Sequence, residues 1–540
     1  MAAKASKAED NNLTDDQTGR GPFADRRDDV TERFSHTLND PYSWLRDPDW
    51  QRVMREPETL RTDIRDHLDA ENAYTDAYLK PIEALREELT AELKARIKED
   101  DASVPTPDGD WDYYRRFAIG GQYPILCRRY RNANVTTDEQ ILIDGNKEAE
   151  GEKFFSIGGA THSPDHSLLA AAIDRNGSEY CVIEIRDLEN GATLPDRIES
   201  AQGDMVFSAD GKTLFYTVLD DNHRPNKVFR HQIGGDPTQD VLIYEETDPG
   251  FFIGVGKTES GRFILIDAHD HADTSEVWMI DAQTPEAKSH LIAKRNTGIS
   301  YDVSDHGDKL IIHTNIGGAV DFKIVEAPVD EPALENWTEI VPHRQGCLIR
   351  STILFEKYLV RHERESALPR IVIRNLTSGE EHPITFDEEA YDLSLHPGYE
   401  YTTTNLRFAY SSPTTPQRIY DYDMATRERV LRKEQEIPSG HEAEDYICRR
   451  VMAPSHDGVE VPVTILHRQD TPIDGSAPML LYGYGSYGYA MPAAFSPNVF
   501  SLVDRGMVYA IAHIRGGTEG GYNWYLDGKL KKKKNTFLDF

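Results

Sequence analysis

A short pattern recurs seven times between residues 101 and 430 and constrains the fold more than any other feature of the sequence. Each copy is a polar turn, in most cases built from Ser, Asp and Gly, followed by an apolar run such as KTLFYTV or RFILIDA. The spacing of about 40 to 56 residues is near the period of propeller blades of four strands each. The copies begin at or near Pro107, Ser163, Ser208, Glu259, Ser304, Phe355 and His396.

The repeat predicts a seven-bladed β-propeller over residues 101–430. One four-stranded sheet cannot bury both of its faces, whereas a closed ring of such sheets can. A pair of β-sandwiches and a β-solenoid are the alternatives, and the number of copies and their period favour the propeller. The Gly-His and Trp-Asp marks of WD40 repeats do not recur in these copies, so another type of propeller is expected.

The segments on either side of the repeats have a different pattern. Residues 1–30 are polar with few large apolar side chains, which predicts a disordered tail. In residues 31–100, apolar side chains such as Leu60 and Ile64 recur at helical spacing, so this segment is predicted to be helical. From 431 to 540, strands alternate with short helices and two glycine-rich loops, which indicates an α/β domain.

The charge of the chain is one-sided, with 93 acidic and 60 basic residues and a formal net charge of −33. Such a surface repels the phosphates of nucleic acids, so nucleic acid is not an expected partner, whereas cationic ligands would be attracted. No apolar run reaches the roughly 18 residues that a membrane span requires, and the first residues lack the apolar core of a signal peptide. We therefore expect a cytoplasmic protein that does not bind membranes.

The four cysteines lie far apart in the sequence and form no CxxC pair. A disulfide framework is therefore not expected in a chain of this size, and no metal site is predicted. The cysteines are Cys127, Cys181, Cys347 and Cys448.

The first glycine-rich loop, residues 483–488, is the strongest candidate for a functional element. It matches GxGxxG after a predicted strand, but Pro492 and Pro497 interrupt the helix that a dinucleotide site needs, so no cofactor is predicted. An α/β-hydrolase builds its oxyanion hole at such a strand end, and the phenol of Tyr484 is a candidate donor there. Simple packing of this tyrosine is the competing interpretation.

No complete catalytic constellation occurs in the sequence. GxSxG, the nucleophile motif of hydrolases, is absent, because Tyr484 occupies the first glycine position relative to Ser486. The zinc-peptidase motif HExxH is absent too, since residues 441–445 read HEAED.

Three C-terminal segments, LLYGYGSYG, DRGMVYAIAHIRGGTEGG and NWYLDGKLKKKKNTFLDF, resemble the prolyl oligopeptidase family of serine peptidases, most closely its oligopeptidase B branch. DPYSWLR at residues 40–46 and ENAY at residues 71–74 extend the resemblance over most of the chain. The resemblance implies a seven-bladed propeller inserted into an α/β-hydrolase domain that takes segments from both ends of the chain. It also implies cofactor-free hydrolysis of short peptides, basic ones included, after Arg or Lys, by acyl transfer.

By the same resemblance, Tyr484 corresponds to the tyrosine that stabilises the oxyanion, and Tyr487 to an aromatic residue near the S1 substrate pocket. The family's serine elbow and the Asp and His of its triad would follow Phe540, so these 540 residues alone are expected to be inactive. A fragment, a split gene or a frameshift would explain this, and the cut hydrolase sheet would expose a strand edge. The alternative is a non-catalytic acidic propeller module that binds cationic peptides.

Two positions depart from the family pattern. Residues 491–494 (MPAA) are uncharged where oligopeptidase B often carries acids, which weakens the expectation of dibasic substrates. Thr518 replaces the last glycine of the Arg-Gly-Gly-Gly-Glu motif, although Glu519 is kept, so the bend of this second glycine loop is an open question.

Overall fold

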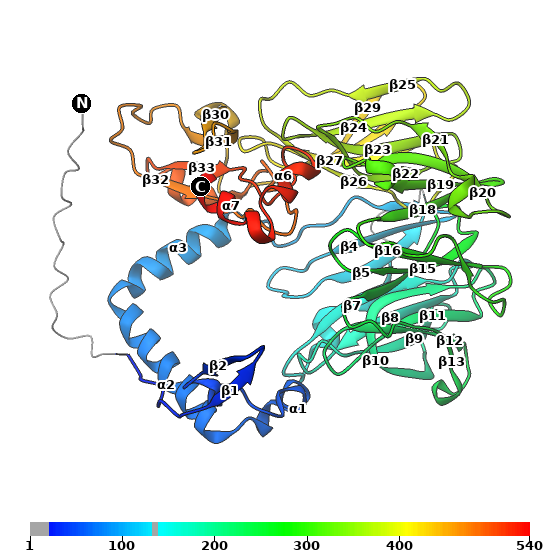
Figure 1. Cartoon of the computed structure of the whole chain (residues 1–540), viewed down its shortest axis with the longest axis horizontal. Coiled ribbons are helices and arrows are strands. Elements are labelled where there is room, and N and C mark those ends of the chain that lie inside the picture. Colours follow the sequence, from blue (N-terminus) through cyan, green and yellow to red (C-terminus); the bar gives the residue numbers. More distant parts are fainter. Residues whose placement is uncertain (1–20, 132–138) are drawn as a thin grey trace. The chain divides into compact units, whose positions relative to one another are not determined.

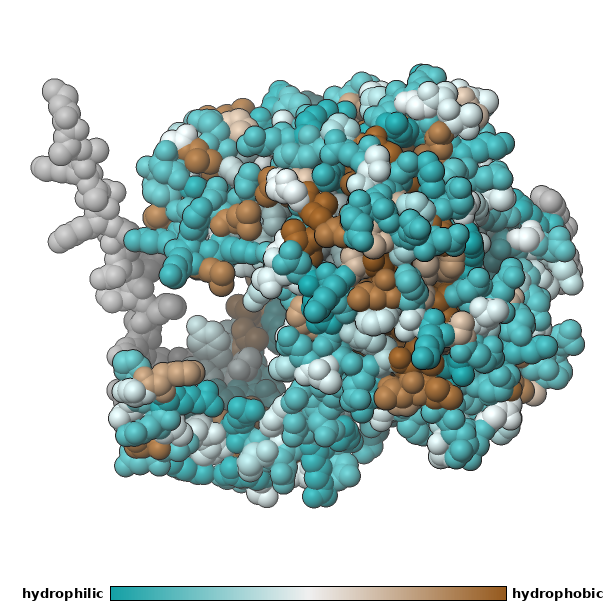
Figure 2. Space-filling view, turned by 45° about the vertical axis from the view of Figure 1, so that its right-hand side comes forward, coloured by the Kyte–Doolittle hydropathy of each residue, from teal (hydrophilic) through white to brown (hydrophobic). Residues whose placement is uncertain are grey.

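The computed structural model describes residues 21–131 and 139–540, which form two compact units, one up to Glu92 and one from Leu93 to Phe540 (Figure 1). Of the predicted disordered tail, residues 1–20 lie outside the described residues, and residues 21–29 form neither helix nor strand. Within the described residues, no helix is both long and apolar enough to cross a membrane. Hydrophilic residues dominate the face seen in Figure 2, in keeping with the high content of charged residues.

The first unit contains a β-hairpin and helices. The indole of Trp44 donates a hydrogen bond to the Asp25 carbonyl and lies under the guanidinium of Arg27, 3.8 Å from the ring centre. Ile64 is buried, whereas Leu68 of the same helical stripe is 48% exposed. The elements are β1 (Val30–Arg33), β2 (His36–Asn39), α1 (Trp50–Arg55), α2 (Thr62–Leu79) and α3 (Glu83–Ala95), the last of which runs into the second unit.

The second unit begins with a seven-bladed propeller, which confirms the predicted fold (Figure 1). Each blade is an antiparallel sheet of four strands in sequence order. Blades 1 to 3 are formed by β3 (Thr106–Asp108), β4 (Trp111–Arg116), β5 (Ile125–Tyr130) and β6 (Gln140–Asp144); by β7 (Ser156–His162), β8 (Leu168–Asp174), β9 (Cys181–Asp187) and the first part of β10 (Thr193–Phe207); and by the second part of β10 with β11 (Thr213–Leu219), β12 (Pro225–Gln232) and β13 (Val241–Glu245). A short helix, α4 (Gly145–Glu148), follows β6.

The remaining four blades follow the same plan. They are formed by β14 (Phe252–Lys257), β15 (Phe263–His269), β16 (Ser275–Asp281) and β17 (His290–Leu291); by β18 (Tyr301–His306), β19 (Lys309–Thr314), β20 (Lys323–Pro328) and β21 (Thr338–Val341); by β22 (Cys347–Leu354), β23 (Tyr358–Glu365), β24 (Leu368–Asn375) and β25 (Glu381–Ile384); and by β26 (Asp392–His396), β27 (Asn405–Ser411), β28 (Arg418–Asp423) and β29 (Arg429–Glu434).

The repeated sequence pattern marks the turn between the first and second strands of each blade. In blade 3, the hydroxyl of Ser208 donates to the carboxylate of Asp210 and accepts the backbone N–H of Thr213, which closes the hairpin. Ser163 does the same with Asp165 and the N–H of Leu168 in blade 2. The serine and aspartate of the repeat therefore satisfy backbone groups that the turn would otherwise leave unpaired.

Apolar cores lie between neighbouring blades. Among the described residues, six clusters of buried side chains each join two consecutive blades. The cluster between blades 6 and 7, for example, contains Phe355 and Phe408. Blades 1 and 7, which meet where the ring closes, share neither such a cluster nor a strand within the described residues. We call this contact the seam.

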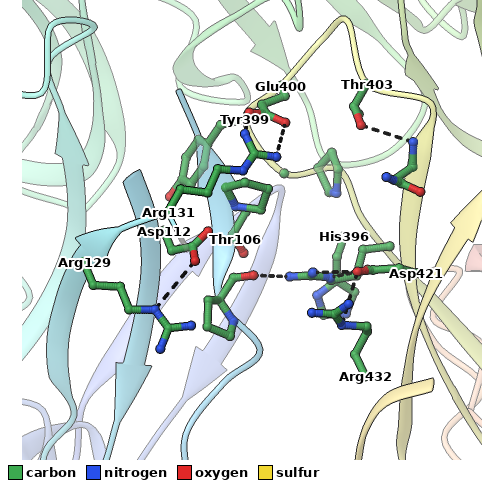
Figure 3. Close-up of a pocket in the computed structure, with 16 residues that line it drawn as sticks. Thr106, Asp112, Arg129, Arg131, His396, Tyr399, Glu400, Thr403, Asp421 and Arg432 are labelled. Carbon is green, nitrogen blue, oxygen red and sulfur yellow. Dashed lines mark hydrogen bonds and ion pairs between the residues drawn. The ribbon is translucent and has the colours of Figure 1, made fainter. Parts of the chain in front are cut away.

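The seam is polar and contains a pocket of about 300 Å³ (Figure 3). An ion pair joins Arg131 of blade 1 to Glu400 of blade 7, with 2.6 Å between nitrogen and oxygen. The guanidinium of Arg407 in blade 7 donates to the Pro105 carbonyl next to blade 1, at 2.7 Å. Ion pairs and hydrogen bonds therefore hold the seam, in contrast to the six apolar contacts.

An α/β segment follows the propeller. Its sheet has the order β30 (Tyr446–Pro454), β31 (Glu460–Arg468), β33 (Val508–Ala512) and β32 (Met479–Tyr482), with only β32 and β33 parallel. The turn His456-Asp457-Gly458 joins β30 to β31, as the sequence predicts. β32 is an edge strand in the described sheet, and Met479 is 56% exposed on it. The helices are α5 (Phe500–Val503), α6 (Tyr522–Leu526) and α7 (Lys534–Asp539).

Candidate active site

Both glycine-rich loops lie at the carboxyl ends of the two parallel strands. Residues 483–488 follow β32, and residues 515–521 follow β33. Because parallel strands end at the same edge of a sheet, the two loops meet there, and this edge is where open α/β sheets bind their ligands. The Gly488 N–H donates to the Gly516 carbonyl at 2.9 Å. The fold thus brings together two sequence segments that were predicted separately.

Close packing requires glycine at two positions of these loops. A Cβ on Gly516, whose φ is +104°, would collide with the carbonyl oxygen of Gly485. A Cβ on Gly485 would meet the side chains of Thr536 and Ile514. Side chains at either position would therefore displace the loops or the residues packed against them.

Tyr484 lies in the first loop, directly after β32 and Gly483. Its side chain is 45% exposed, and its ring packs edge-on against Tyr489 with 5.7 Å between ring centres. Within the described part of the chain, its hydroxyl has no hydrogen-bond partner, so the O–H is free to donate. A rigid loop that presents a free phenol at this sheet edge has the chemistry of an oxyanion donor.

Tyr487 is 85% exposed and has a left-handed backbone, with φ of 55°. Such a conformation is unfavourable for a residue with a side chain and persists only where the surrounding loop imposes it. The structure thus places both candidate tyrosines on one loop with their side chains exposed. The next residue of the loop, Gly488, is also left-handed, at φ of 69°.

Ser486 is held in place rather than exposed as a nucleophile. The ammonium of Lys533 donates to the Ser486 hydroxyl and to the Gly485 carbonyl. Burial lowers the pKa of Lys533. These bonds fix the first loop to the start of α7.

Thr518 ties the two loops together, which answers the question raised by its replacement of a glycine. Its hydroxyl donates to the Gly488 carbonyl at 2.8 Å and accepts from Arg364 of blade 6 at 3.3 Å. The left-handed residues of this loop are Gly516 and Gly521, so a β-branched residue fits at 518 without strain. Burial, together with the nearby Arg350, lowers the pKa of Arg364 to about 10.

The kept glutamate of the motif, Glu519, is 3% exposed and bonds to the segment that follows the first loop. Its carboxylate accepts the backbone N–H of Met491 at 2.9 Å. Met491 begins the uncharged stretch at residues 491–494. Three residues of this stretch, Met491, Pro492 and Ala494, line an apolar pocket of about 260 Å³. No carboxylate lines this pocket in the described structure.

An ion triad, buried at two of its three members, fixes the second loop. The guanidinium of Arg515 binds both carboxylate oxygens of Asp539, at 2.6 and 2.8 Å, and also contacts Asp457 at 2.7 Å. Asp539 accepts further hydrogen bonds from the Ser455 hydroxyl and the Arg515 N–H. Its side chain is fully buried and that of Arg515 is 5% exposed. The three charged residues come from separate segments, and sequence reasoning missed the group.

A seven-bladed propeller joined to this α/β sheet, with an exposed tyrosine on a fixed glycine loop, defines a propeller-bearing α/β-hydrolase. Two family descriptions match the sequence: the N-terminal β-propeller domain of prolyl oligopeptidase over residues 22–435 and the prolyl oligopeptidase family over residues 493–540. The chain therefore belongs to the prolyl oligopeptidase family of serine peptidases.

Individual relatives agree with this assignment. Dipeptidyl aminopeptidase BI of Pseudoxanthomonas mexicana is 40% identical over 517 residues, which cover 93% of this chain and 70% of that protein. Protease 2 of Moraxella lacunata is 30% identical over 524 residues, covering 96% and 74%. Two solved oligopeptidase B structures match 96% of this chain and 75% of their own chains. The structure from Leishmania major has a TM-score of 0.91 and 30% sequence identity. The structure from Trypanosoma brucei, in the closed form with covalently bound antipain, has a TM-score of 0.89 and 31% sequence identity.

Proposed function

We propose that this chain forms the propeller and the oxyanion side of a serine oligopeptidase that hydrolyses short peptides after Arg or Lys. The observation that carries the proposal is the free, exposed hydroxyl of Tyr484 on a loop clamped at the carboxyl end of β32. In acyl transfer, a serine attacks the scissile carbonyl, and a donor at this position stabilises the negative oxygen that forms. Tyr487, on the same loop, is proposed to contact the substrate near the S1 pocket.

The nucleophile of this reaction is not among residues 1–540, because these contain no GxSxG. A hydrogen-bond donor cannot replace a nucleophile, so the 540-residue chain by itself is proposed to have no turnover. A fluorophosphonate probe, which labels activated serines, tests this directly on the purified chain. We expect no labelling; labelling that Ser486→Ala abolishes would overturn the proposal and identify Ser486 as the nucleophile.

If the reading frame continues past codon 540, the longer protein tests the role of Tyr484. Tyr484→Phe removes only the hydroxyl and is expected to lower kcat by about 10² to 10³, the usual effect of losing one oxyanion donor. Tyr482→Phe is the matched control, because Tyr482 is also exposed, at 43%, but lies on β32 itself. Equal rates for Tyr484→Phe and the unaltered enzyme would refute the assigned role.

The substrate preference is proposed as a single basic residue before the cleaved bond. The apolar pocket lined by Met491, Pro492 and Ala494 supports this, since it offers no carboxylate to a second basic side chain. The names of the relatives raise a further alternative, removal of N-terminal dipeptides. Comparing hydrolysis of N-terminally blocked and free dipeptide substrates that end in Arg separates these modes. The four unpaired cysteines support a reducing compartment such as the cytoplasm.

A second candidate function is capture of cationic peptides without cleavage. Asp204 of β10 and Asp267 of β15 line a pocket of about 390 Å³ between blades 3 and 4. Burial raises the pKa of both carboxyls, and Asp267 raises that of Asp204 further. A bound cation would offset this repulsion. Fluorescence anisotropy with a labelled Arg-rich peptide tests this candidate; binding that Asp267→Asn does not weaken would exclude this pocket.

A further inference from the structure

Two histidines and one aspartate lie together where the first strands of blades 1 and 2 end. Asp108 ends β3, His162 ends β7, and His166 lies in the turn that follows β7. Each offers one ligand atom, and these three atoms lie within 4.8 Å of one another. Hydrogen bonds from the α/β segment reach other parts of the propeller, among them the loop at Asp321 and the end of β23 at Arg364.

The tautomer of His162 leaves a buried lone pair next to a carboxylate. Its Nδ1 lies 3.1 Å from the Ser163 carbonyl, which can only accept, so Nδ1 carries the hydrogen. Nε2 is buried and has no hydrogen-bond partner among the described residues, and it lies 3.3 Å from Oδ2 of Asp108. The side chain is 10% exposed, so solvent satisfies little of it. Two acceptor atoms this close to each other are stabilised by a cation that both can contact.

His166 occupies a position that other blades give to glycine. The equivalent turn residues are Gly211 in blade 3, Gly261 in blade 4 and Gly307 in blade 5, all left-handed. His166 has the same left-handed backbone, with φ of 62°, although a side chain makes this conformation unfavourable. A strained residue that persists at one of several equivalent turns points to a role for its side chain.

The surroundings orient both imidazoles. Nδ1 of His166 lies 2.9 Å from the Tyr113 hydroxyl, which leaves Nε2 for a ligand. The Tyr113 ring stacks on His162, with 4.2 Å between centres and 11° between planes, and Tyr399 packs against His162 edge-on. Partners of this kind fix the orientation of histidines that bind metals. The ammonium of Lys257 could balance the charge of Asp108 in place of a metal ion, but no ion pair within 4.0 Å joins the two residues in the described structure.

We propose that Asp108, His162 and His166 bind one divalent transition-metal ion of the zinc type. Two imidazoles and a carboxylate are donors that zinc accepts at tetrahedral sites, with a fourth position for water. Because the ligands belong to two blades, the ion joins blade 1 to blade 2 next to the polar seam. Its role is structural: it stabilises the first blade, whose other neighbour is blade 7.

The test titrates Zn²⁺ into chelator-treated 540-residue protein by isothermal calorimetry. We expect one ion per chain and a higher unfolding temperature with Zn²⁺ than without it. His162→Gln is expected to abolish the site. Tyr113→Phe, which removes the hydroxyl that bonds to His166, should weaken binding by about 10- to 100-fold.

His166→Gly separates loss of the site from misfolding. Glycine suits the left-handed turn, so this variant should fold at least as well as the parent in chelator and yet lose zinc binding and the zinc-dependent rise in unfolding temperature. His290→Gln, at an exposed histidine of β17, is the control and should bind normally. Absence of stoichiometric binding in the parent, or undiminished binding in His166→Gly and His162→Gln, would overturn the proposal and leave only an ion pair between His162 and Asp108.

Discussion

Removing the carboxylate of Asp539 tests whether the ion triad holds the second glycine loop. The side chain of Asp539 is fully buried and accepts hydrogen bonds from Ser455 and from three nitrogens of Arg515. Burial raises the pKa of this carboxyl, but its hydrogen bonds with Arg515 and Ser455 lower it by more, so it is ionised at neutral pH. Asp539→Ala leaves Arg515 buried with Asp457 as its remaining ionic partner.

The expected cost is about 3 to 5 kcal/mol, the range for breaking a buried ion pair by removing one partner. Summing the hydrogen bonds to Asp539 at about 1.5 to 3 kcal/mol each would exceed this range, because contributions within one network are not additive. Since each 1.4 kcal/mol is a factor of about ten, local opening of residues 515–539 should become roughly 100- to 5,000-fold more frequent.

Hydrogen exchange measures this opening peptide by peptide, which suits a chain that need not unfold in one step. Asp470→Ala is the matched control: Asp470 pairs with Arg468 in the same α/β segment but is 75% exposed, so no measurable change is expected. Exchange in residues 515–539 that stays within threefold of the parent, or that changes equally in both variants, would refute the reasoning.

Three further predictions follow from other parts of the molecule. Hydrogen bonds with Arg116 lower the pKa of Glu139 from 4.5 to about 2, so the contribution of Glu139 to folding stability is complete above pH 4.5 and disappears as the pH falls toward 2. Glu139→Gln should therefore flatten this part of a plot of urea midpoint against pH, and an unchanged slope would contradict the prediction. Burial raises the pKa of every thiol, to about 12 for Cys127 and Cys448 and about 11 for the other two cysteines, so iodoacetamide at pH 8 should label the native chain slowly and all four thiols in guanidinium; rapid native labelling of Cys448 would be inconsistent with this. Gly516→Ala should speed hydrogen exchange in both glycine loops, whereas Gly475→Ala, with the same left-handed backbone but open space around it, should not; equal effects would show that backbone strain, not collision, is responsible.

The propeller could be predicted from sequence because its turns carry their own chemistry. Ser208 and Asp210 bond within a few residues of each other, so the pattern that closes the hairpin is visible in the sequence itself. The sharing of β10 by two blades was not predictable, since it depends on a register shift between Ala201 and Met205. No local residue pattern announces such a shift.

The candidate site residues divide in the same way. Tyr484 could be proposed from sequence because it follows a predicted strand within a recognisable glycine loop. The partners of Arg515 lie 58 and 24 residues away, and only the folded sheet brings them together. His162 and His166 are four residues apart and could have been noticed, but Asp108 belongs to another blade, so sequence analysis predicted no metal site.

The seam is polar, whereas the other six contacts between neighbouring blades are apolar. Salts that strengthen apolar association tighten the contacts between consecutive blades, whereas the same ions screen the pair between Arg131 and Glu400. Separating blades 1 and 7 exposes charged groups that water solvates well, whereas separating any other pair of neighbouring blades exposes an apolar surface. Ionic strength thus affects the contact that closes the ring differently from the contacts between consecutive blades. The ring is expected to open first at the seam between blades 1 and 7.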